Sequence, residues 1–490
     1  MAECFQFCYA GPVVFMKTYT PTIGLEIHAE LKTQTKMFCD SRNDPDEEQP
    51  NVNICPICMG HPGTLPTINK EAVKHILKIG VAIGGTIADF TEFDRKNYFY
   101  PDIPKGYQIS QYKYPLVSGG LLCGVALTRV HLEEDTGKNT HVGDESLIDF
   151  NRAGVPLMEL VTEPVIHSAE DAVHFAKELQ LLLRYLGVAN ANMEKGEMRV
   201  EANISLSADP KKFGTKVEVK NLNSFRAVER AITYELQRQQ ELLEKGERIV
   251  QETRGWNEVK EVTVSQRQKE DSHDYRYFPD PDLPKLWISE IQEFSHDALE
   301  REIGELPQAR RERYGRNFGL NPEEVEFYIT QPEWGDYFEK LIIDFHGDKK
   351  KIKLSSNYLT SDLVGLVKKE PIQWQTQPIP HTAFVSLINL LSEEKIGSRA
   401  AKDILVVMFS EPAVANPLKI AEEKGLLQKT DETELKNITQ KIIADNTKVV
   451  ADYKAGKEVA LQFLIGQAMK ATRGAAKPDL LAKIFMEQLQ

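Results

Sequence analysis

Hydrophobic and polar positions alternate most strictly near the N-terminus, over residues 22–31. Apolar residues recur at every second position, and the positions between them include Glu26, His28 and Glu30. A period of two predicts a β-strand with one buried face. An imidazole flanked by one carboxylate on each side is an unusual composition for a strand face that is only exposed to solvent. We therefore predict that this face lines a functional site.

The same alternation predicts further strands, at residues 125–133, 144–150, 156–162, 198–206 and 215–220. Between the strands, apolar residues at helical spacing follow Asn69, Ser168 and Ser224, which are residue types that cap helix N-termini. Many short strands with interspersed helices predict an α+β fold with a large antiparallel sheet.

Proline punctuates residues 278–284, Phe-Pro-Asp-Pro-Asp-Leu-Pro, and the pattern beyond them turns helical. We interpret this stretch as a linker. The sequence then predicts an N-terminal extension over residues 1–18, a strand-rich domain over 19–290, a helical domain over 291–404 and a small helical tail domain over 405–490.

Composition narrows the class of protein. The net charge of −13 argues against non-specific nucleic-acid binding, although residues 401–490 carry nearly equal numbers of basic and acidic side chains. No apolar run reaches the roughly 18–20 residues that cross a bilayer, so we expect no membrane association. Six cysteines in 490 residues argue against a disulfide scaffold and favour a cytoplasmic location.

Carboxylates alternate with basic or polar side chains on the other predicted strands as well. These groups are Arg129-His131-Glu133, Glu159, Arg199-Glu201-Asn203 and Lys216-Glu218-Lys220. If such carboxylates converged in one cavity, a cation would be needed to offset their repulsion. Oxygen ligands with one imidazole favour Mg²⁺, which commonly accompanies phosphates. The alternative is the ordinary solvated face of a one-sided sheet, and spacing alone leaves both interpretations open.

Cations and aromatic residues occur together at residues 95–102 and 273–279. The cations include Arg95, Lys96 and Arg276. Such clusters suit phosphate contacts with base stacking, and equally an aromatic packing loop. No Gly-x-x-x-x-Gly-Lys phosphate loop is present in the chain.

Cys39 and the Cys55-Pro-Ile-Cys58 pair have the spacing of a zinc site. His61 is the nearest candidate for the fourth ligand. The alternative is that the three cysteines are buried and bind no metal.

Together, these residues resemble a known family. The matching stretches are residues 24–28, 94–102, 107–111, 131–138, 151–157, 201–205, 213–216, 220–225 and 274–279. They are similar to those of the GatB family, the B subunits of the aspartyl/glutamyl-tRNA amidotransferases, from about residue 19 to the end. The length leaves no room for the inserted domain of the GatE relatives.

The resemblance implies a specific activity. Such proteins use ATP and Mg²⁺ to phosphorylate the side-chain carboxylate of Glu-tRNA(Gln) or Asp-tRNA(Asn), and ammonia then displaces the phosphate. A glutaminase, the A subunit, supplies the ammonia, and the small C subunit holds both larger subunits. The implied fold is a catalytic cradle domain, a helical domain and a YqeY-like tail that contacts tRNA.

The resemblance also implies site residues. The Mg²⁺ ions and nucleotide phosphates would be held by Glu26, His28, Glu134, Glu159 and Glu201. Strand alternation selects Glu133 rather than Glu134, so that pair stays open. Lys216 and Lys220 are our own candidates for neutralising phosphate, and Arg95, Lys96 and Arg276 are further candidates for contacts to the nucleotide.

Two positions depart from the family pattern. Many relatives have Asp where Glu201 stands, which puts the metal distances in doubt. Zinc-bearing relatives often have Cys-x-Cys where this chain has Cys39-Asp-Ser41, which puts the fourth ligand, and zinc itself, in doubt.

Two rival functions remain at this point: an ATP-dependent ligase acting on a small free carboxylic acid, and a non-catalytic tRNA-binding scaffold. A small substrate gives no reason for the helical tail, and a scaffold leaves the carboxylate-bearing strands unexplained.

Overall fold

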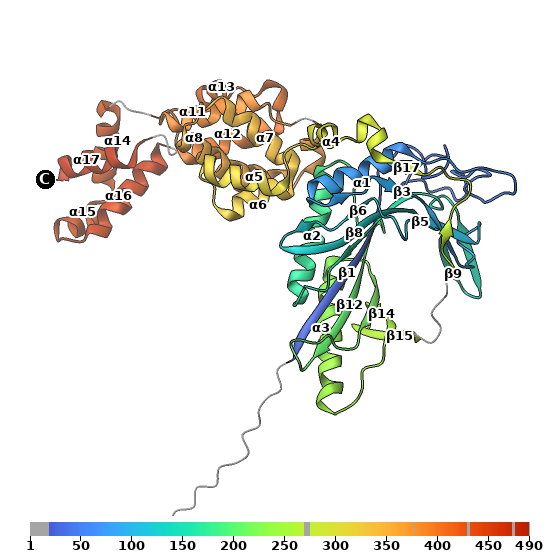
Figure 1. Ribbon diagram of the computed structural model, residues 1–490. Helices are drawn as coiled ribbons and strands as arrows, with labels where there is room; N and C mark the ends of the chain where they lie inside the picture. Colours follow the sequence, from blue (N-terminus) through green and yellow to red (C-terminus); the bar gives the residue numbers. More distant parts are fainter. Residues whose placement is uncertain (1–18, 269–274, 377, 429–431, 473–475, 490) are drawn as a thin grey trace, which may run out of the picture. The chain divides into compact units, whose positions relative to one another are not determined.

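The computed structural model describes residues 19–268, 275–376, 378–428, 432–472 and 476–489. The chain divides into two compact units, residues 1–307 and 308–490 (Figure 1). The predicted extension over residues 1–18 lies outside the described residues, as do His273 and Asp274 of the second aromatic cluster.

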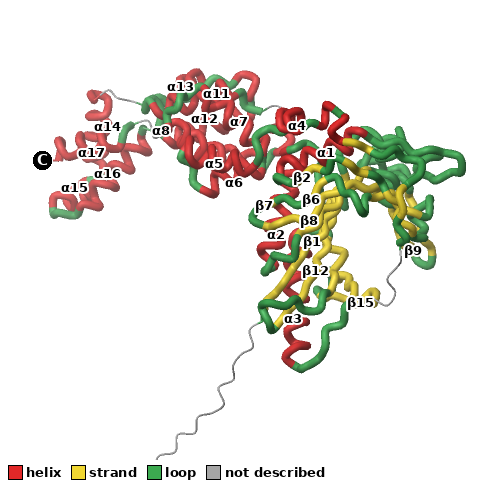
Figure 2. Tube along the Cα trace, in the orientation of Figure 1, coloured by secondary structure: helices red, strands yellow, loops and turns green. Residues whose placement is uncertain are grey.

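A ten-stranded sheet organises the first unit. Its strands, in spatial order, are β15 (Val262–Gln268), β14 (Glu252–Asn257), β13 (Val217–Leu222), β12 (Met198–Ser207), β1 (Thr20–Glu30), β11 (Pro156–Thr162), β8 (Val125–Glu134), β6 (Val117–Ser118) and β2 (Thr86–Ile87), with β7 (Leu121–Leu122) paired to β8. The strand predicted first from the sequence, β1, lies in the interior of this sheet. The prediction of a strand-rich α+β domain is confirmed (Figure 2).

One strand pair is parallel, which departs from the predicted antiparallel sheet. Strands β13 and β14 run in the same direction, and α3 (Phe225–Glu244) connects them. A parallel pair needs a crossover of this kind, because a tight hairpin can only join antiparallel strands.

Three helices cover the apolar face of the sheet. They are α1 (Lys70–Ala82), α2 (Ala169–Tyr185) and α3. The alternating apolar residues of β1, from Ile23 to Ala29, belong to the hydrophobic core that these helices complete. Because this side is occupied by packing, the polar side chains of the central strands point to the opposite side.

The predicted helix caps are present. The Asn69 side chain accepts hydrogen bonds from the backbone N–H groups of Glu71 and Ala72 at the start of α1. Ser168 accepts from the Asp171 N–H at the start of α2, and Ser224 accepts from the Ala227 N–H at the start of α3. These bonds satisfy N–H groups that have no partner within the helix.

Short strands form three smaller sheets. The pairs are β9 (Lys138–Val142) with β10 (Glu145–Asp149), and β17 (Leu286–Trp287) with β3 (Phe90–Thr91); the third sheet has the order β16 (Phe278–Pro279), β4 (Asp94–Asn97), β5 (Tyr107–Ser110).

Residues 278–284 are therefore not the domain linker that their prolines suggested. Phe278 and Pro279 pair with β4, and Asp280 is buried, where its carboxylate accepts a 2.9 Å hydrogen bond from Arg95 Nε. The first unit continues beyond them through α4 (His296–Glu302).

The second unit is helical. Its helices are α5 (Pro307–Arg313), α6 (Pro322–Thr330), α7 (Pro332–Ile343), α8 (Lys349–Asn357), α9 (Val364–Val367), α10 (Pro371–Thr376), α11 (His381–Ser392), α12 (Ser398–Ser410), α13 (Pro417–Glu423), α14 (Glu432–Asp445), α15 (Thr447–Lys454), α16 (Glu458–Ala471) and α17 (Pro478–Leu489). The last four form a hydrophobic core of their own, which includes Leu435, Leu464 and Phe485. The predicted tail boundary at residue 405 falls within α12. Among the described residues, no helix combines the length and the apolar character that a membrane span requires.

Candidate active site

Strand register lines up the polar side chains of the central strands. His28 on β1 lies opposite Glu159 on β11 and Arg199 on β12, while Glu159 lies opposite His131 on β8. In the neighbouring row, Glu26 lies opposite Glu201. Directly opposed residues on adjacent strands share a face of the sheet, so four strands contribute to one polar surface.

Five of these side chains form a compact group that we call the central cluster: Glu26, His28, His131, Glu133 and Glu159. His28 Nε2 lies 3.5 Å from Glu159 Oε2, 3.7 Å from Glu133 Oε1 and 3.9 Å from Glu26 Oε1. His131 Nε2 lies 3.4 Å from the same Glu159 oxygen. Three carboxylates thus surround two imidazoles at the middle of the sheet.

The ionisation of the cluster reflects this crowding. Burial by itself would lower the pKa of His28, but its hydrogen bond to Glu159 and the charges of the neighbouring carboxylates raise that pKa to about 9. Burial, together with Glu159 and Glu201, raises the pKa of Glu26. Burial opposes the ionisation of Glu159, yet the two imidazoles hold its pKa well below the usual range.

The donor set of the cluster fits a hard divalent cation. Within the described part of the chain, Glu133 Oε2 and His131 Nδ1 are buried and have no hydrogen-bond partner. One potential ligand atom from each of Glu26, His28 and Glu159 lies within 4.8 Å of the others, and the same holds for His131, Glu133 and Glu159. Carboxylate oxygens are ligands that Mg²⁺ accepts, and an ion would use the unsatisfied Glu133 oxygen. The charge of the ion would also favour loss of the proton from His28, which would free that imidazole to bind.

A cavity of 660 Å³ opens beside the cluster on the same side of the sheet. It is lined by acidic, basic and aromatic residues: Glu26, Lys96, Tyr100, Ser110, Gln111, Tyr112, Arg129, His131, Glu159, Glu218, Lys220, Thr253, Gln266, Tyr275 and Tyr277. Its volume falls within the range of roughly 300–1,000 Å³ that small-molecule sites occupy.

Basic side chains that line this cavity pair with carboxylates of the same polar surface or lie near them. Lys220 Nζ donates to Glu201 Oε2 at 2.7 Å, and Arg129 donates to Glu159 Oε1 at 3.2 Å. Lys96 Nζ lies 5.1 Å from the centre of the Tyr275 ring. Burial would lower the pKa of Lys96, but Glu133 and the other acidic groups raise it, so Lys96 stays charged. The site therefore combines an acidic centre, whose donor atoms fit a cation, with ammonium and guanidinium groups suited to phosphate.

Three of the candidate cations do not line the cavity. Lys216 is exposed and precedes β13, and Arg276 is exposed with a positive φ of 43°. Arg95 is held by Asp280 and by Asp282, at 2.9 and 3.0 Å. Because these ion pairs engage the guanidinium, Arg95 links β4 to the residues that follow β16.

The structure separates Glu134 from Glu133. Glu133 shares the parity of His131 on β8 and points into the central cluster. Glu134 points to the other face, where its carboxylate pairs with Lys105 and accepts a 2.8 Å hydrogen bond from the Ile109 N–H. Of the two residues left open by the sequence, Glu133 therefore belongs to the central cluster and Glu134 lies outside it, because adjacent strand residues face opposite sides.

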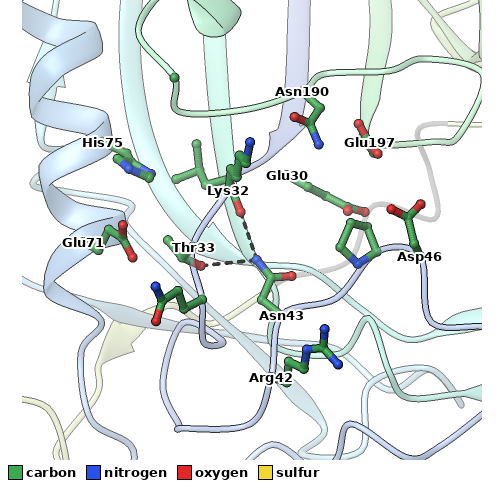
Figure 3. Close-up of a pocket in the computed structure, with 14 residues that line it drawn as sticks. Glu30, Lys32, Thr33, Arg42, Asn43, Asp46, Glu71, His75, Asn190 and Glu197 are labelled. Atoms are coloured by element: carbon green, nitrogen blue, oxygen red, sulfur yellow. Dashed lines mark hydrogen bonds between the residues drawn. The ribbon is translucent and has the colours of Figure 1, made fainter. Parts of the chain in front are cut away.

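A second ionic group adjoins the cluster at the end of β1. Arg199 Nη2 donates to Asp135 at 2.6 Å, and Arg152 Nε lies 3.5 Å from the same carboxylate oxygen. Glu30 lies beside them and lines a separate cavity of 890 Å³ (Figure 3). Burial and the neighbouring Asp135 raise the pKa of Glu30 to about 8, whereas Asp135, despite its burial, has a pKa lowered to about 2 by the two arginines.

This pair predicts a pH-dependent stability. Unfolded Glu30 would ionise near its ordinary pKa, while the folded carboxyl keeps its proton up to about pH 8. Folding therefore takes up a proton between these values, and stability falls as pH rises through that window. Glu30→Gln removes this loss. We expect the free energy of unfolding of Glu30→Gln, relative to that of wild type, to be more favourable at pH 9 than at pH 5 by on the order of 2 kcal/mol. Urea unfolding of both proteins at both pH values measures this difference. An equal effect of the substitution at the two pH values would contradict the shifted pKa.

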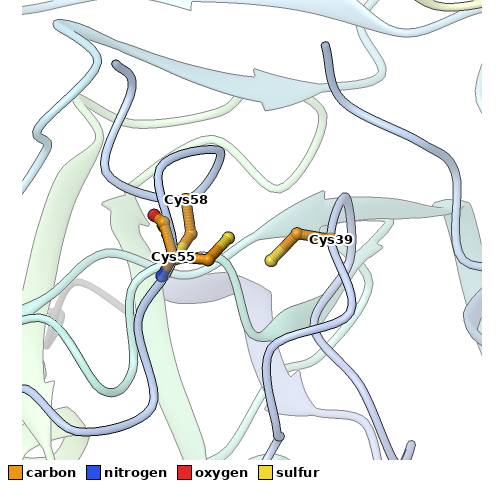
Figure 4. A group of neighbouring side chains, drawn as sticks. All are labelled: Cys39, Cys55 and Cys58. Carbon is orange, nitrogen blue, oxygen red and sulfur yellow. Dashed lines mark hydrogen bonds between the residues drawn. The ribbon is translucent and has the colours of Figure 1, made fainter. Parts of the chain in front are cut away.

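The predicted zinc ligands lie together. The sulfur atoms of Cys39, Cys55 and Cys58 are within 4.8 Å of one another (Figure 4). A hydrogen bond from Cys39 lowers the pKa of Cys58 to about 4 and raises that of Cys39. Lys36, fully buried, places its Nζ 3.8 Å from Cys58 Sγ. His61, the nearest candidate for a fourth ligand, is exposed and does not belong to the group.

Sequence reasoning missed part of the site. The alternation at residues 129–133 indicated His131 and Glu133, and could have placed both in the cluster. Tyr277 lay in the predicted cluster of cations and aromatic residues at 273–279, whereas Tyr112 gave no comparable signal. The cavity assembles from the central sheet and from residues in or next to β4, β5 and β16, which are distant in sequence.

Comparisons with known proteins agree with the geometry. A family model described as "GatB/GatE catalytic domain" matches residues 21–293, and a second, "GatB domain", matches residues 336–489. The chain is 43% identical to the B subunit of the aspartyl/glutamyl-tRNA(Asn/Gln) amidotransferase of Caldanaerobacter subterraneus subsp. tengcongensis, over 96% of this chain and 99% of the relative. It is 41% identical to the B subunit from Carboxydothermus hydrogenoformans, over 97% and 99%, and 43% identical to that from Thermomicrobium roseum, over 96% and 99%. With its catalytic-domain match centred on the strands that carry the cluster, the chain belongs to the GatB family.

Proposed function

We propose that this chain is the B subunit of a tRNA-dependent amidotransferase. It would phosphorylate the side-chain carboxylate of Glu-tRNA(Gln) or Asp-tRNA(Asn) with ATP and then amidate it. It would act in the cytoplasm as a heterotrimer, whose other members are a glutaminase, the A subunit, together with the small C subunit. The observation that carries the proposal is the central cluster beside a 660 Å³ cavity in a member of the GatB family.

The chemistry requires an activated carboxylate, because the oxygen of a free carboxylate is a poor leaving group. The substrate carboxylate oxygen attacks the γ-phosphorus of ATP, ADP leaves, and an acyl phosphate results. Ammonia then attacks the carbonyl carbon, the C–O bond to phosphate breaks, and the products are an amide and inorganic phosphate. Both steps depend on charge neutralisation and positioning more than on a protein nucleophile.

The residues of the cavity suit these steps. Lys96 and Lys220 would face the transferring phosphoryl group, and Arg129 would offset charge next to Glu159. The donor atoms of the central cluster would hold Mg²⁺, with Glu201 and Glu218 as a second group beside Glu26. When bound, the ion would supply positive charge at the phosphate oxygens.

The position of Glu133 yields a prediction about metal affinity. Glu133→Gln keeps the side-chain shape and removes one ligand charge, so we expect about a tenfold higher Mg²⁺ concentration for half-maximal amidation. Glu134→Gln should leave that Mg²⁺ dependence unchanged, because Glu134 faces the other side of the sheet. Amidation rates titrated with Mg²⁺ compare the two variants. A shift in Glu134→Gln alone would reverse the assignment.

We further propose structural Zn²⁺ at Cys39, Cys55 and Cys58. Three thiolates around Zn²⁺ leave a net negative charge, and the buried Lys36 ammonium would balance it. Metal analysis of the purified chain should find about one zinc per chain, and Cys58→Ser should remove most of it. Wild-type protein free of zinc after expression in zinc-supplemented medium would contradict this site.

Reconstitution tests the function directly. The chain is co-expressed with candidate A and C subunits, and the complex is supplied with ATP, Mg²⁺, glutamine and each mischarged tRNA. We expect Gln-tRNA(Gln), Asn-tRNA(Asn) or both, with one ADP formed per amide. Amide formation on free glutamate or aspartate, without tRNA, would favour the small-molecule ligase instead. Tight tRNA binding without any amide would favour the scaffold.

A further inference from the structure

An aromatic wall, formed by Tyr112, Tyr275 and Tyr277, lines part of the cavity. Tyr112 and Tyr277 stack face to face, with ring centres 4.3 Å apart and planes 10° from parallel. Tyr275 meets Tyr277 edge to face, at 6.0 Å and 71°. All three rings line the cavity that also contains Glu159 and Lys96.

One face of this wall is available to a ligand. Tyr112 is 65% exposed although its inner face is covered by Tyr277. Its backbone N–H donates to Asp94 Oδ2 at 3.0 Å, and this hydrogen bond holds the backbone of Tyr112 next to β4. An exposed aromatic ring held in this way loses little conformational freedom when a second planar group stacks on it.

We propose that Tyr112 is an adenine-stacking residue, with Tyr277 as the ring that supports it. The proposal rests on the proposed function, since both substrates of that reaction carry an adenine: ATP itself, and the 3′-terminal adenosine of tRNA, next to the ester-linked amino acid. An adenine on Tyr112 would have its phosphates or its attached amino acid in the same cavity as Lys96 and the central cluster. Stacking on an aromatic ring is a common way for proteins to hold a base.

Steady-state amidation by the reconstituted complex distinguishes the two adenines. Tyr112→Leu should raise one KM by about five- to 100-fold: that for ATP if the nucleotide's adenine stacks there, or that for aminoacyl-tRNA if the terminal adenosine does. Tyr112→Phe keeps the ring, so both KM values should stay within about twofold of wild type. Unchanged KM values for both substrates in Tyr112→Leu would overturn the proposal.

Trp287→Leu is the matched control. Trp287 is 48% exposed and packs on Phe90 with ring centres 5.0 Å apart, and it does not line the cavity. Both KM values should be unaffected in this variant. An increase equal to that of Tyr112→Leu would show a general loss of fold and overturn the stacking role.

A second measurement keeps the proposal separate from the proposed function. Calorimetric titration of the same complexes with ATP and with adenosine 5′-monophosphate needs no amidation. If the wild-type complex amidates neither tRNA, the proposed function fails. A loss of adenine-nucleotide affinity in Tyr112→Leu, but not in Tyr112→Phe, would still support the stacking role. Equal affinity for both nucleotides in wild type and Tyr112→Leu, with neither KM changed, would exclude it.

Discussion

His28→Ala is expected to reduce amidation by on the order of 10²–10³-fold while leaving tRNA binding nearly intact. His28 contacts more of the central cluster than any other single group we describe, with Glu26, Glu133 and Glu159 all within 4 Å of its Nε2. Without this imidazole the three carboxylates would rearrange. The cation that they are proposed to hold, and the ATP phosphates next to it, would then shift as well. A tRNA is far larger than this cavity, so most of its contacts would lie elsewhere and should persist.

Three measurements on the reconstituted complex check this result: the amidation rate, the tRNA affinity, and the thermal shift produced by Mg²⁺ with ATP. We expect the first and the third to fall and the second to persist. His174→Ala is the control, because His174 is an exposed histidine on α2, on the helical side of the sheet. It should behave as wild type in all three measurements.

A purely structural role for His28 would give a different pattern. His28 carries a raised pKa and would act as a cation among carboxylates even without a metal. In that case the variant would melt earlier, but the surviving protein would amidate and would respond to Mg²⁺ normally. Undiminished formation of Gln-tRNA or Asn-tRNA by His28→Ala would exclude the proposed metal site.

The sequence predicted the central strands because their signal is local. In β1 the apolar residues from Ile23 to Ala29 are buried at every second position, as the spacing required. Helix starts were equally local, since Asn69 and Ser168 bond to N–H groups two or three residues ahead. Period and capping chemistry therefore determined elements, faces and fold class before any tertiary contact was known.

Features that depend on distant contacts were harder to predict. The prolines of residues 278–284 predicted a linker, yet Phe278 pairs with β4. A local sequence pattern does not indicate pairing with a strand that is distant in the chain. Strand alternation selected Glu133 rather than Glu134, but the choice stayed open until the structure showed that β8 continues through both residues. The cavity itself forms where β4 and β5 approach the central sheet, so Tyr112 could not be placed in it from its neighbours in the chain.

Truncation after Gln428 is expected to weaken tRNA affinity by about 10- to 100-fold while leaving the first unit folded. Helices α14–α17 have their own hydrophobic core, whereas a cut at residue 405 would divide α12 and remove the buried Met408 and Phe409 from the core of the second unit. The later cut therefore removes a self-contained part. Lys470 on α16 and Lys483 on α17 are exposed, and such ammonium groups contact phosphate readily.

The measurement is tRNA affinity at several salt concentrations, with the KM for ATP as an internal control. An electrostatic contact predicts that the salt dependence of binding becomes shallower in the truncated complex, since fewer counterions are released on binding. The KM for ATP should not change, because the cavity lies wholly within residues 26–277.

A double variant, Lys470→Glu with Lys483→Glu, tests whether the charges of the tail, rather than its mere presence, contribute to tRNA affinity. It keeps the core of α14–α17 and should still lose part of the affinity that the truncation loses. If the truncated complex bound tRNA with full affinity and an unchanged salt dependence, the tail would have to serve a purpose other than tRNA contact. The acidic chain would then depend on its partner subunits for attraction to the substrate.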